Sequence, residues 1–191
     1  MLILLRHGES VLNRGAKLLG TSDPHLTDLG REQAGKAREL LDGVRNIVSS
    51  PLARSIETAE IVSGNQQIRV DERWREVDYG QYEGMKLADL SEEVRSRWIR
   101  DPSFCPPDGE SLVEVAQRVS SALEDLKEQA SEMDVLVVSH VSPIKAAVAL
   151  TLGVDMSVAW KMRLSLCSLT RIIVDDSKMT LIGFNEVPYP H

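Results

Sequence analysis

Cysteine, aromatic residues and long apolar runs are all scarce in this sequence, and each shortage excludes a class of protein. The two cysteines, Cys105 and Cys167, lie far apart and form no CxxC pair, which argues against a disulfide framework and a zinc site. No segment reaches the roughly 20 apolar residues that span a membrane. The opening MLILL is too short for the apolar part of a signal peptide and follows no basic region. We therefore expect a cytoplasmic protein without membrane contacts.

Positive charge is also in deficit. The chain has 22 Lys and Arg against 29 Asp and Glu, a formal net charge of -7 at pH 7, whereas nucleic-acid surfaces are basic. There is no GxxxxGK[ST] loop, which argues against the simplest nucleotide triphosphatase. There is no DxD, HxH or HExxH group either, so we expect neither a metal nor another cofactor. A site for an anionic substrate must then be a local basic pocket in an acidic protein.

Short apolar runs indicate the fold class. Those at residues 2–5, 47–48 and 135–138 do not alternate with polar residues, as is typical of strands covered on both faces. Helical patterns lie between them, so we predict an α/β protein with three layers, α/β/α, around a mostly parallel sheet. Residues 166–174 and 179–184 read as two strands of a hairpin, which we place at the sheet edge. At 191 residues, the whole chain is expected to form one domain, 1–191.

Boundary residues predict four helices, over residues 28–41, 52–64, 112–126 and 143–152. Thr27 is a suitable N-cap for the first of these. Ser111 and Glu114 form the S-x-x-E pattern of a capping box before the third. Ser142 can cap the fourth, with Pro143 at its first position.

The segment at about 78–110 differs in composition from the rest of the chain. It contains YGQYEG, a charged helical stretch around residues 87–99, and the irregular loop DPSFCPPDGE. An excursion of this kind between core elements is a natural lid or substrate-selecting segment, although a merely decorative insertion carries equal weight.

Two of the predicted strands end in histidine. LILLRH ends in His7 and VLVVSH ends in His140, and ligands of open parallel sheets bind outside the carboxyl ends of the strands. The helix after His140 directs free backbone N–H groups to that edge, which suits an anion. A third strand-to-helix run, IVSSPLARSIETA, places Arg54 in the first helical turn. Together with Arg6, these groups suit a dianionic phosphoryl group.

Four motifs in order resemble the histidine phosphatase superfamily, also called the phosphoglycerate mutase-like family. They are LLRHGES, SSPLARSIETAEIV, WREVDYGQYEG and VVSHVSPIKA, and they span most of the chain. The resemblance implies a phosphoglycerate mutase-like fold and a phosphoric monoester hydrolase that acts through a phosphohistidine. It places the family's acid on Glu76 and a phosphate-contacting amide on Asn13. It also suggests substrate contacts for Gly20, Tyr79 and the backbone of Val141.

Elementary chemistry assigns roles to these residues. A neutral imidazole is nucleophilic near pH 7, so His7 is expected to attack phosphorus without a metal. Arg6, Arg54, Asn13 and a protonated His140 would neutralise the phosphoryl oxygens.

Spacing alone leaves two candidates for the proton donor. Glu76 would protonate the leaving group and then activate water, with Glu83 as a competing acid that the family motif disfavours. Tyr79 either contacts substrate or simply packs in its loop.

One geometric condition applies to the pair Arg6 and His7. On a regular strand they would point to opposite faces. Both reach one pocket only if the strand ends near Leu5 and the backbone bends, which Gly8 permits. An Arg6 side chain on the far side of the sheet would remove its role as a phosphate clamp.

Two rival functions stay open. A phosphoglycerate mutase would use the same site, but that branch usually has a basic residue where this chain has Val77 and a hydroxyl residue where it has Leu19. A catalytically silent phosphate-binding module would have no need of Glu76. We expect a small-molecule phosphate ester as the partner and no nucleic acid. The sequence leaves open whether the chain forms a homodimer and which ester it binds.

Overall fold

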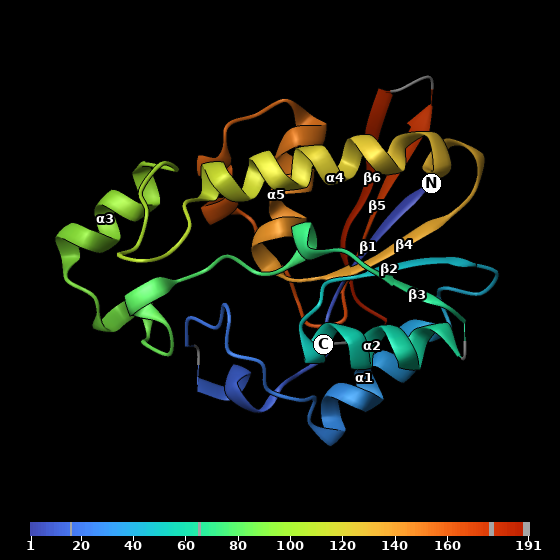
Figure 1. Ribbon diagram of the computed structural model, residues 1–191, viewed down its shortest axis with the longest axis horizontal. Helices are drawn as coiled ribbons and strands as arrows, with labels where there is room; N and C mark the ends of the chain where they lie inside the picture. Colours follow the sequence, from blue (N-terminus) through green and yellow to red (C-terminus); the bar gives the residue numbers. More distant parts are fainter. Residues whose placement is uncertain (16, 65, 176–177, 189–191) are drawn as a thin grey trace.

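One six-stranded sheet forms the centre of the computed structural model, which describes residues 1–15, 17–64, 66–175 and 178–188 (Figure 1). The strands are β1 (Leu2–Arg6), β2 (Asn46–Ser49), β3 (Ile68–Val70), β4 (Val135–Ser139), β5 (Leu169–Asp175) and β6 (Lys178–Glu186). Their order is β3-β2-β4-β1-β5-β6. The first four strands run parallel, and β5 and β6 join antiparallel beside β1. The mostly parallel sheet and the edge hairpin are therefore confirmed.

The α-helices are α1 (Asp28–Arg38), α2 (Ala53–Ser63), α3 (Glu92–Arg100), α4 (Leu112–Glu132) and α5 (Val141–Leu152). All of them except α3 cover the two faces of the sheet (Figure 1). Figure 1 shows α4 and α5 on one side of the sheet and α1 and α2 on the other, which is the predicted three-layer arrangement. Among the described residues, no helix is long and apolar enough to cross a bilayer.

The side chains of β1 divide between two cores. Leu2 and Leu4 pack with buried residues of α4 and α5, whereas Ile3 and Leu5 pack with those of α1 and α2. Alternate strand side chains point to opposite faces, so a strand covered on both sides must be apolar at every position. This packing explains the uninterrupted LILL run, and it holds the end of β1 rigidly.

Helix boundaries were predicted with mixed success. The capping box of Ser111 and Glu114 is present, and Thr27 accepts a hydrogen bond from the N–H of Gly30 as an N-cap. The first helix, however, ends at Arg38 rather than near Leu41, because the following N–H groups bond to carbonyls three residues back.

Two further elements differ from expectation. α5 begins at Val141 with His140 as its N-cap residue, two residues before the predicted start at Pro143, so Ser142 lies inside the helix. The three-residue edge strand β3, IRV, was not predicted, because it is too short and too charged to show a strand pattern.

The excursion at 78–110 is closed at its base. The N–H of Gln81 donates to the Pro107 carbonyl, and the N–H of Glu110 donates to the Asp78 carbonyl, both at 2.9 Å. Gly80 has φ of 51°, and a side chain there would collide with the Pro107 carbonyl. Between these ends lie α3 and short 3-10 helices at Gly80–Tyr82 and Leu87–Asp89. Figure 1 shows α3 projecting beyond the body of the sheet.

Candidate active site

The two strand-end histidines meet at the carboxyl edge of the sheet. Neighbouring parallel strands β1 and β4 hold them in register, with Arg6 opposite Ser139. The ring centroids of His7 and His140 are 5.0 Å apart, with an angle of 55° between the ring planes. His7 is 3% exposed and His140 is fully buried. His7 and His140, which belong to two separate sequence motifs, therefore lie together in one compact site.

The hydrogen bonds of His7 define its tautomer. Its Nδ1 lies 2.7 Å from the carbonyl oxygen of Gly8, and because a carbonyl can only accept, Nδ1 carries the proton. Burial, together with the charges of Arg6 and Arg54, holds the pKa of His7 well below its ordinary value of 6.5. The ring is therefore neutral at pH 7, and its Nε2 keeps a free electron pair.

Gly8 serves this arrangement in a different way from the one expected. Its φ is not positive, and its N–H donates to the Thr58 hydroxyl at 3.0 Å. A side chain at Gly8 would collide with the backbone of Gly30, in the first turn of α1. Close packing of the β1 end against α1, and not an unusual backbone bend, is therefore what requires glycine here.

His140 is held by two serines that the sequence analysis did not single out. Its Nε2 lies 2.7 Å from the Ser50 hydroxyl and 3.1 Å from the Ser55 hydroxyl, while its Nδ1 is buried without a partner in the described structure. Both serines belong to the SSPLARS motif, with Ser50 directly after β2 and Ser55 in the first turn of α2, and these positions could have identified them. The hydroxyls can donate to Nε2, which leaves the proton on Nδ1.

Burial lowers the pKa of His140 well below 6.5, and the charges of Arg54 and Arg6 act in the same direction. These effects favour a neutral ring that donates through its Nδ1–H. A protonated His140 that holds a phosphoryl group stays a prediction.

The two arginines are held by backbone carbonyls. Arg54, in the first turn of α2, is fully buried and donates to the carbonyls of Ser22 at 2.6 Å and Gly20 at 2.9 Å. Arg6 donates to the Leu164 carbonyl at 2.7 Å. Burial lowers the pKa of both guanidinium groups, and the nearby negative charge of Glu76 partly opposes that shift. In each case Nε is buried with no partner among the described residues.

The condition posed for Arg6, that the strand ends near Leu5, is not met. β1 continues through Arg6, and strand alternation places Arg6 on the α5 face with Leu2 and Leu4. The charge of Arg6 nevertheless contributes to lowering the pKa of His7. Its role as a phosphate clamp stays a prediction.

Glu76 is buried at the start of α5. Its carboxyl oxygens accept hydrogen bonds from the N–H groups of Val141, Ser142 and Val77, at 3.0, 3.0 and 2.9 Å. The N–H of Val141, which the sequence analysis assigned to the substrate, is therefore engaged by Glu76 in this structure. Glu76 acts as the side-chain cap that α5 otherwise lacks.

Glu83 has a separate position. It accepts from the N–H groups of Gly20 at 2.9 Å and Ser22 at 3.1 Å, and so joins the loop before α1 to the excursion. Both backbone groups of Gly20 are thus used within the protein, because its carbonyl accepts from Arg54. A side chain at Gly20 would collide with the Val77 carbonyl, which explains the glycine without a substrate contact.

Asn13 and Tyr79 are both partly buried. Asn13 Oδ1 accepts from the N–H and hydroxyl of Ser10, at 2.9 and 2.7 Å, which orients the amide. Tyr79 packs edge-on against Trp98, with ring centroids 5.8 Å apart. Burial and the charge of Glu76 raise its pKa, so Tyr79 is un-ionised.

A cavity of about 110 Å³ adjoins these residues. It is lined by Leu18, Val77, Tyr79, Trp98, Leu112, Val141, Ser142, Lys145, Ala159 and Trp160. Val141 and Ser142 belong both to this cavity and to the hydrogen bonds of Glu76, so the cavity opens beside the proposed acid.

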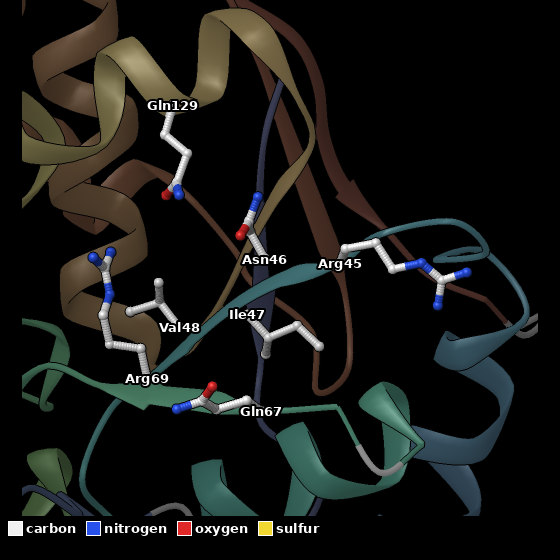
Figure 2. A pocket seen from close by; sticks show the side chains of 7 residues that line it. All are labelled: Arg45, Asn46, Ile47, Val48, Gln67, Arg69 and Gln129. Carbon is white, nitrogen blue, oxygen red and sulfur yellow. The ribbon is translucent and has the colours of Figure 1, made fainter.

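A larger hollow lies elsewhere and is not part of this site. It measures about 350 Å³ and is lined by Arg45, Asn46, Ile47, Val48, Gln67, Arg69 and Gln129 (Figure 2). Asn46 is the first residue of β2, so this hollow lies toward the amino end of the strand, away from His7 and His140. Figure 2 shows the Arg45 side chain pointing away from the other labelled groups. Across the described ranges, no cluster of three His, Cys, Asp or Glu is arranged to hold a metal ion.

Known proteins resemble this chain in sequence. A bifunctional protein of Mycobacterium tuberculosis is 36% identical over 177 residues, and the match covers 88% of this chain but 49% of that protein, so the chain spans about half of its length. Putative phosphoserine phosphatase 2 of Hydrogenobacter thermophilus is 34% identical, over 97% of this chain and 95% of the relative. The probable phosphoglycerate mutase GpmB of Salmonella arizonae is also 34% identical, over 95% and 88%.

Solved structures agree with the fold. The Entamoeba histolytica phosphoserine phosphatase in complex with 3-phosphoglyceric acid has a TM-score of 0.89 at 28% identity, covering 97% of this chain and 96% of that one. A mycobacterial glucosyl-3-phosphoglycerate phosphatase in complex with VO3 has a TM-score of 0.86 at 30% identity, covering 97% and 98%. Residues 2–187 match the family described as the histidine phosphatase superfamily, branch 1. The chain therefore belongs to the histidine phosphatase superfamily.

Proposed function

We propose that this protein is a metal-independent phosphatase that hydrolyses a small phosphorylated metabolite through a phosphohistidine on His7. One observation carries the proposal: within the described part of the chain, the buried donor atoms without a hydrogen-bond partner include Arg6 Nε, Arg54 Nε and His140 Nδ1, and these three belong to residues around a neutral His7. Buried donors without acceptors are costly in a folded protein, and a phosphoryl group would satisfy all three. The relatives named as phosphatases support the same reaction class.

In the first step, Nε2 of His7 attacks phosphorus and the bond from phosphorus to the ester oxygen breaks. The arginines, His140 Nδ1–H and the Asn13 amide hold the phosphoryl oxygens as charge redistributes over them. Glu76, protonated beside the substrate dianion, gives its proton to the departing alkoxide.

In the second step, the Glu76 carboxylate takes a proton from water as that water attacks the phosphohistidine. The bond between phosphorus and Nε2 breaks, which releases inorganic phosphate and restores neutral His7. Glu76 suits this role better than Glu83, because it lies at the cavity beside Val141, whereas Glu83 is committed to the N–H groups of Gly20 and Ser22.

Replacement of the nucleophile tests the proposal directly. His7→Ala should lower kcat for phosphomonoesters by roughly 10⁴-fold or more, because no other group is positioned to form the intermediate. His25→Ala is a matched control, since His25 is exposed and pairs with Glu57. Quenching with detergent at alkaline pH, after addition of a ³²P-labelled ester, should trap an acid-labile and base-stable phosphoenzyme in the wild type and the control only. Full turnover by His7→Ala would refute the assignment.

The mutase is the second candidate, and the relative named as a probable phosphoglycerate mutase favours testing it. Val77 and Leu19, both buried, replace the basic and hydroxyl residues that the mutase branch usually has. We therefore expect the release of inorganic phosphate from 3-phosphoglycerate to be faster than the conversion of 3-phosphoglycerate into 2-phosphoglycerate. Faster formation of 2-phosphoglycerate would reverse this assignment.

A phosphate-binding module without activity is the third candidate. Wild-type protein that binds phosphate but hydrolyses no ester in a broad panel would establish it. A cytoplasmic location, a homodimer and the selective role of the 78–110 excursion stay predictions.

A further inference from the structure

Lys145 is the one basic side chain among the residues that line the cavity beside Glu76, and no acidic side chain lines it. Lys145 lies four residues after Val141 on α5, so both side chains fall on the same face of the helix, with an axial separation of about 6 Å. Val141 in turn donates to Glu76. The lysine therefore lines the same cavity as Val141 and Ser142, whose N–H groups donate to Glu76.

The charge of Lys145 is not neutralised within the protein. No hydrogen-bond or ion-pair partner of its ammonium group occurs in the part of the chain that the structure describes. Burial lowers the pKa of Lys145, and the charge of Glu76 only partly opposes this. A half-buried ammonium group facing mostly apolar walls is unfavourable unless an anion joins it.

We propose that Lys145 binds a carboxylate on the leaving group, so that the preferred substrate is a small phosphorylated carboxylic acid. The inference rests on the proposed function, because it requires the phosphoryl group to be seated at His7. It assigns the second anionic group of the substrate to a residue outside the phosphate site.

The surroundings of Lys145 favour a carboxylate over a second phosphate. The phosphoryl site offers several convergent donors, whereas the cavity offers one ammonium group among Leu18, Val77, Leu112 and the indoles of Trp98 and Trp160. A single cation matches a monoanion, and a dianion would remain undercompensated. The cavity is also far below the roughly 300–1,000 Å³ of pockets for drug-sized ligands, which restricts the carbon skeleton to a few atoms.

A matched pair of substrates tests this assignment. 3-Phosphoglycerate and glycerol 3-phosphate differ by a carboxylate in place of a hydroxymethyl group. Wild-type kcat/KM should be higher for 3-phosphoglycerate by roughly 10- to 100-fold, the range for a charge-assisted hydrogen bond. In Lys145→Met the ratio of the two kcat/KM values should fall close to one, mainly through a higher KM for 3-phosphoglycerate. Lys145→Arg should retain most of the ratio.

Lys161→Met is the matched control, because Lys161 is exposed and follows the cavity residue Trp160 without lining the cavity. Its ratio should equal that of the wild type. Calorimetric binding of both esters to His7→Ala, with and without Lys145→Met, repeats the comparison without turnover.

Three results would overturn the inference. One is an equal wild-type kcat/KM for the two esters, and another is a proportional loss for both in Lys145→Met. The third is equal binding of both esters to His7→Ala. Wild-type protein that hydrolyses neither ester nor any other phosphomonoester would instead overturn the proposed function, and this inference with it.

Discussion

The phosphate site and the adjoining cavity meet at the start of α5 but are built in different ways. The side chains of the phosphate site belong to residues at the ends of strands or in the first turns of helices. Hydrogen bonds to backbone carbonyls or hydroxyls hold them. The cavity draws on the excursion, on α5 and on residues near Trp160, and its walls are mainly apolar. In our proposals the first region supplies the reacting groups, whereas the second discriminates among esters. Changes in the phosphate site should thus affect every ester, and changes in the cavity should affect esters unequally.

Glu76 lies at the boundary of the two regions, and its replacement should have the largest effect of the changes considered next. Glu76→Gln removes the proton donor of the first step, so kcat/KM for alkyl phosphates should fall by roughly 10²- to 10⁴-fold. The loss of kcat/KM should be much smaller for p-nitrophenyl phosphate, whose leaving group needs no proton, although kcat falls for both because Glu76 also activates water in the second step. Steady-state kinetics on both substrates measure the difference.

Glu83→Gln is the matched control for that experiment. It changes a residue that joins two loops, so both substrates should lose similar activity. A selective loss on alkyl phosphates in Glu83→Gln, with none in Glu76→Gln, would move the acid to Glu83.

Ser50 should have a smaller effect, spread evenly over esters. Ser50→Ala removes the shorter of the two hydroxyl contacts to His140 Nε2, so the ring would present its Nδ1–H less often. We expect kcat/KM to fall by about tenfold for all esters. Ser49→Ala is the control, because its buried hydroxyl donates to the Ser50 carbonyl and not to His140. A loss that differs between esters would show that Ser50 acts on the cavity and not only through His140.

The pH dependence of stability gives the smallest effect. His7 and His140 have a lowered pKa in the folded protein, so below about 6.5 the unfolded chain takes up protons that the folded one does not. Their contribution to stability is present above 6.5 and is lost as pH falls toward the folded pKa. Each histidine should lower the free energy of unfolding by at most about 1.4 kcal/mol for each pH unit below 6.5. Urea titrations at pH 7.5 and 5.5 measure this loss as a difference in the free energy of unfolding. At pH 5.5, 10 mM phosphate should raise the free energy of unfolding. A stability that does not change between these pH values would contradict it.

The comparison also explains which features were predictable. β1, β4 and the capping box of Ser111 and Glu114 follow from local patterns, since burial on both faces demands apolar runs and a helix start demands a cap. His7 and His140 directly follow strands, and Arg54 lies in the first turn of the helix after β2, so their convergence follows from the parallel pairing of these strands. The start of α5 could not be placed in this way, because its first N–H groups are satisfied by Glu76, far away in the sequence.

Other features depended on contacts between distant segments. Ser50 and Ser55 reach His140 only because β2 lies beside β4, and Gly8 and Gly20 are required by the backbones of Gly30 and Val77. The cavity around Lys145 forms where α5, the excursion and the segment near Trp160 pack together.

The sequence by itself determined the order of strands and helices, the family and the candidate phosphate-binding residues, because these depend on local patterns and on motifs that keep their spacing. Only the tertiary structure decided the tautomer of His7, the neutral state of His140, the partners of Glu76 and the cation in the cavity. Protonation and selectivity depend on burial and on the distance between charges, and both arise when segments far apart in the chain are brought together.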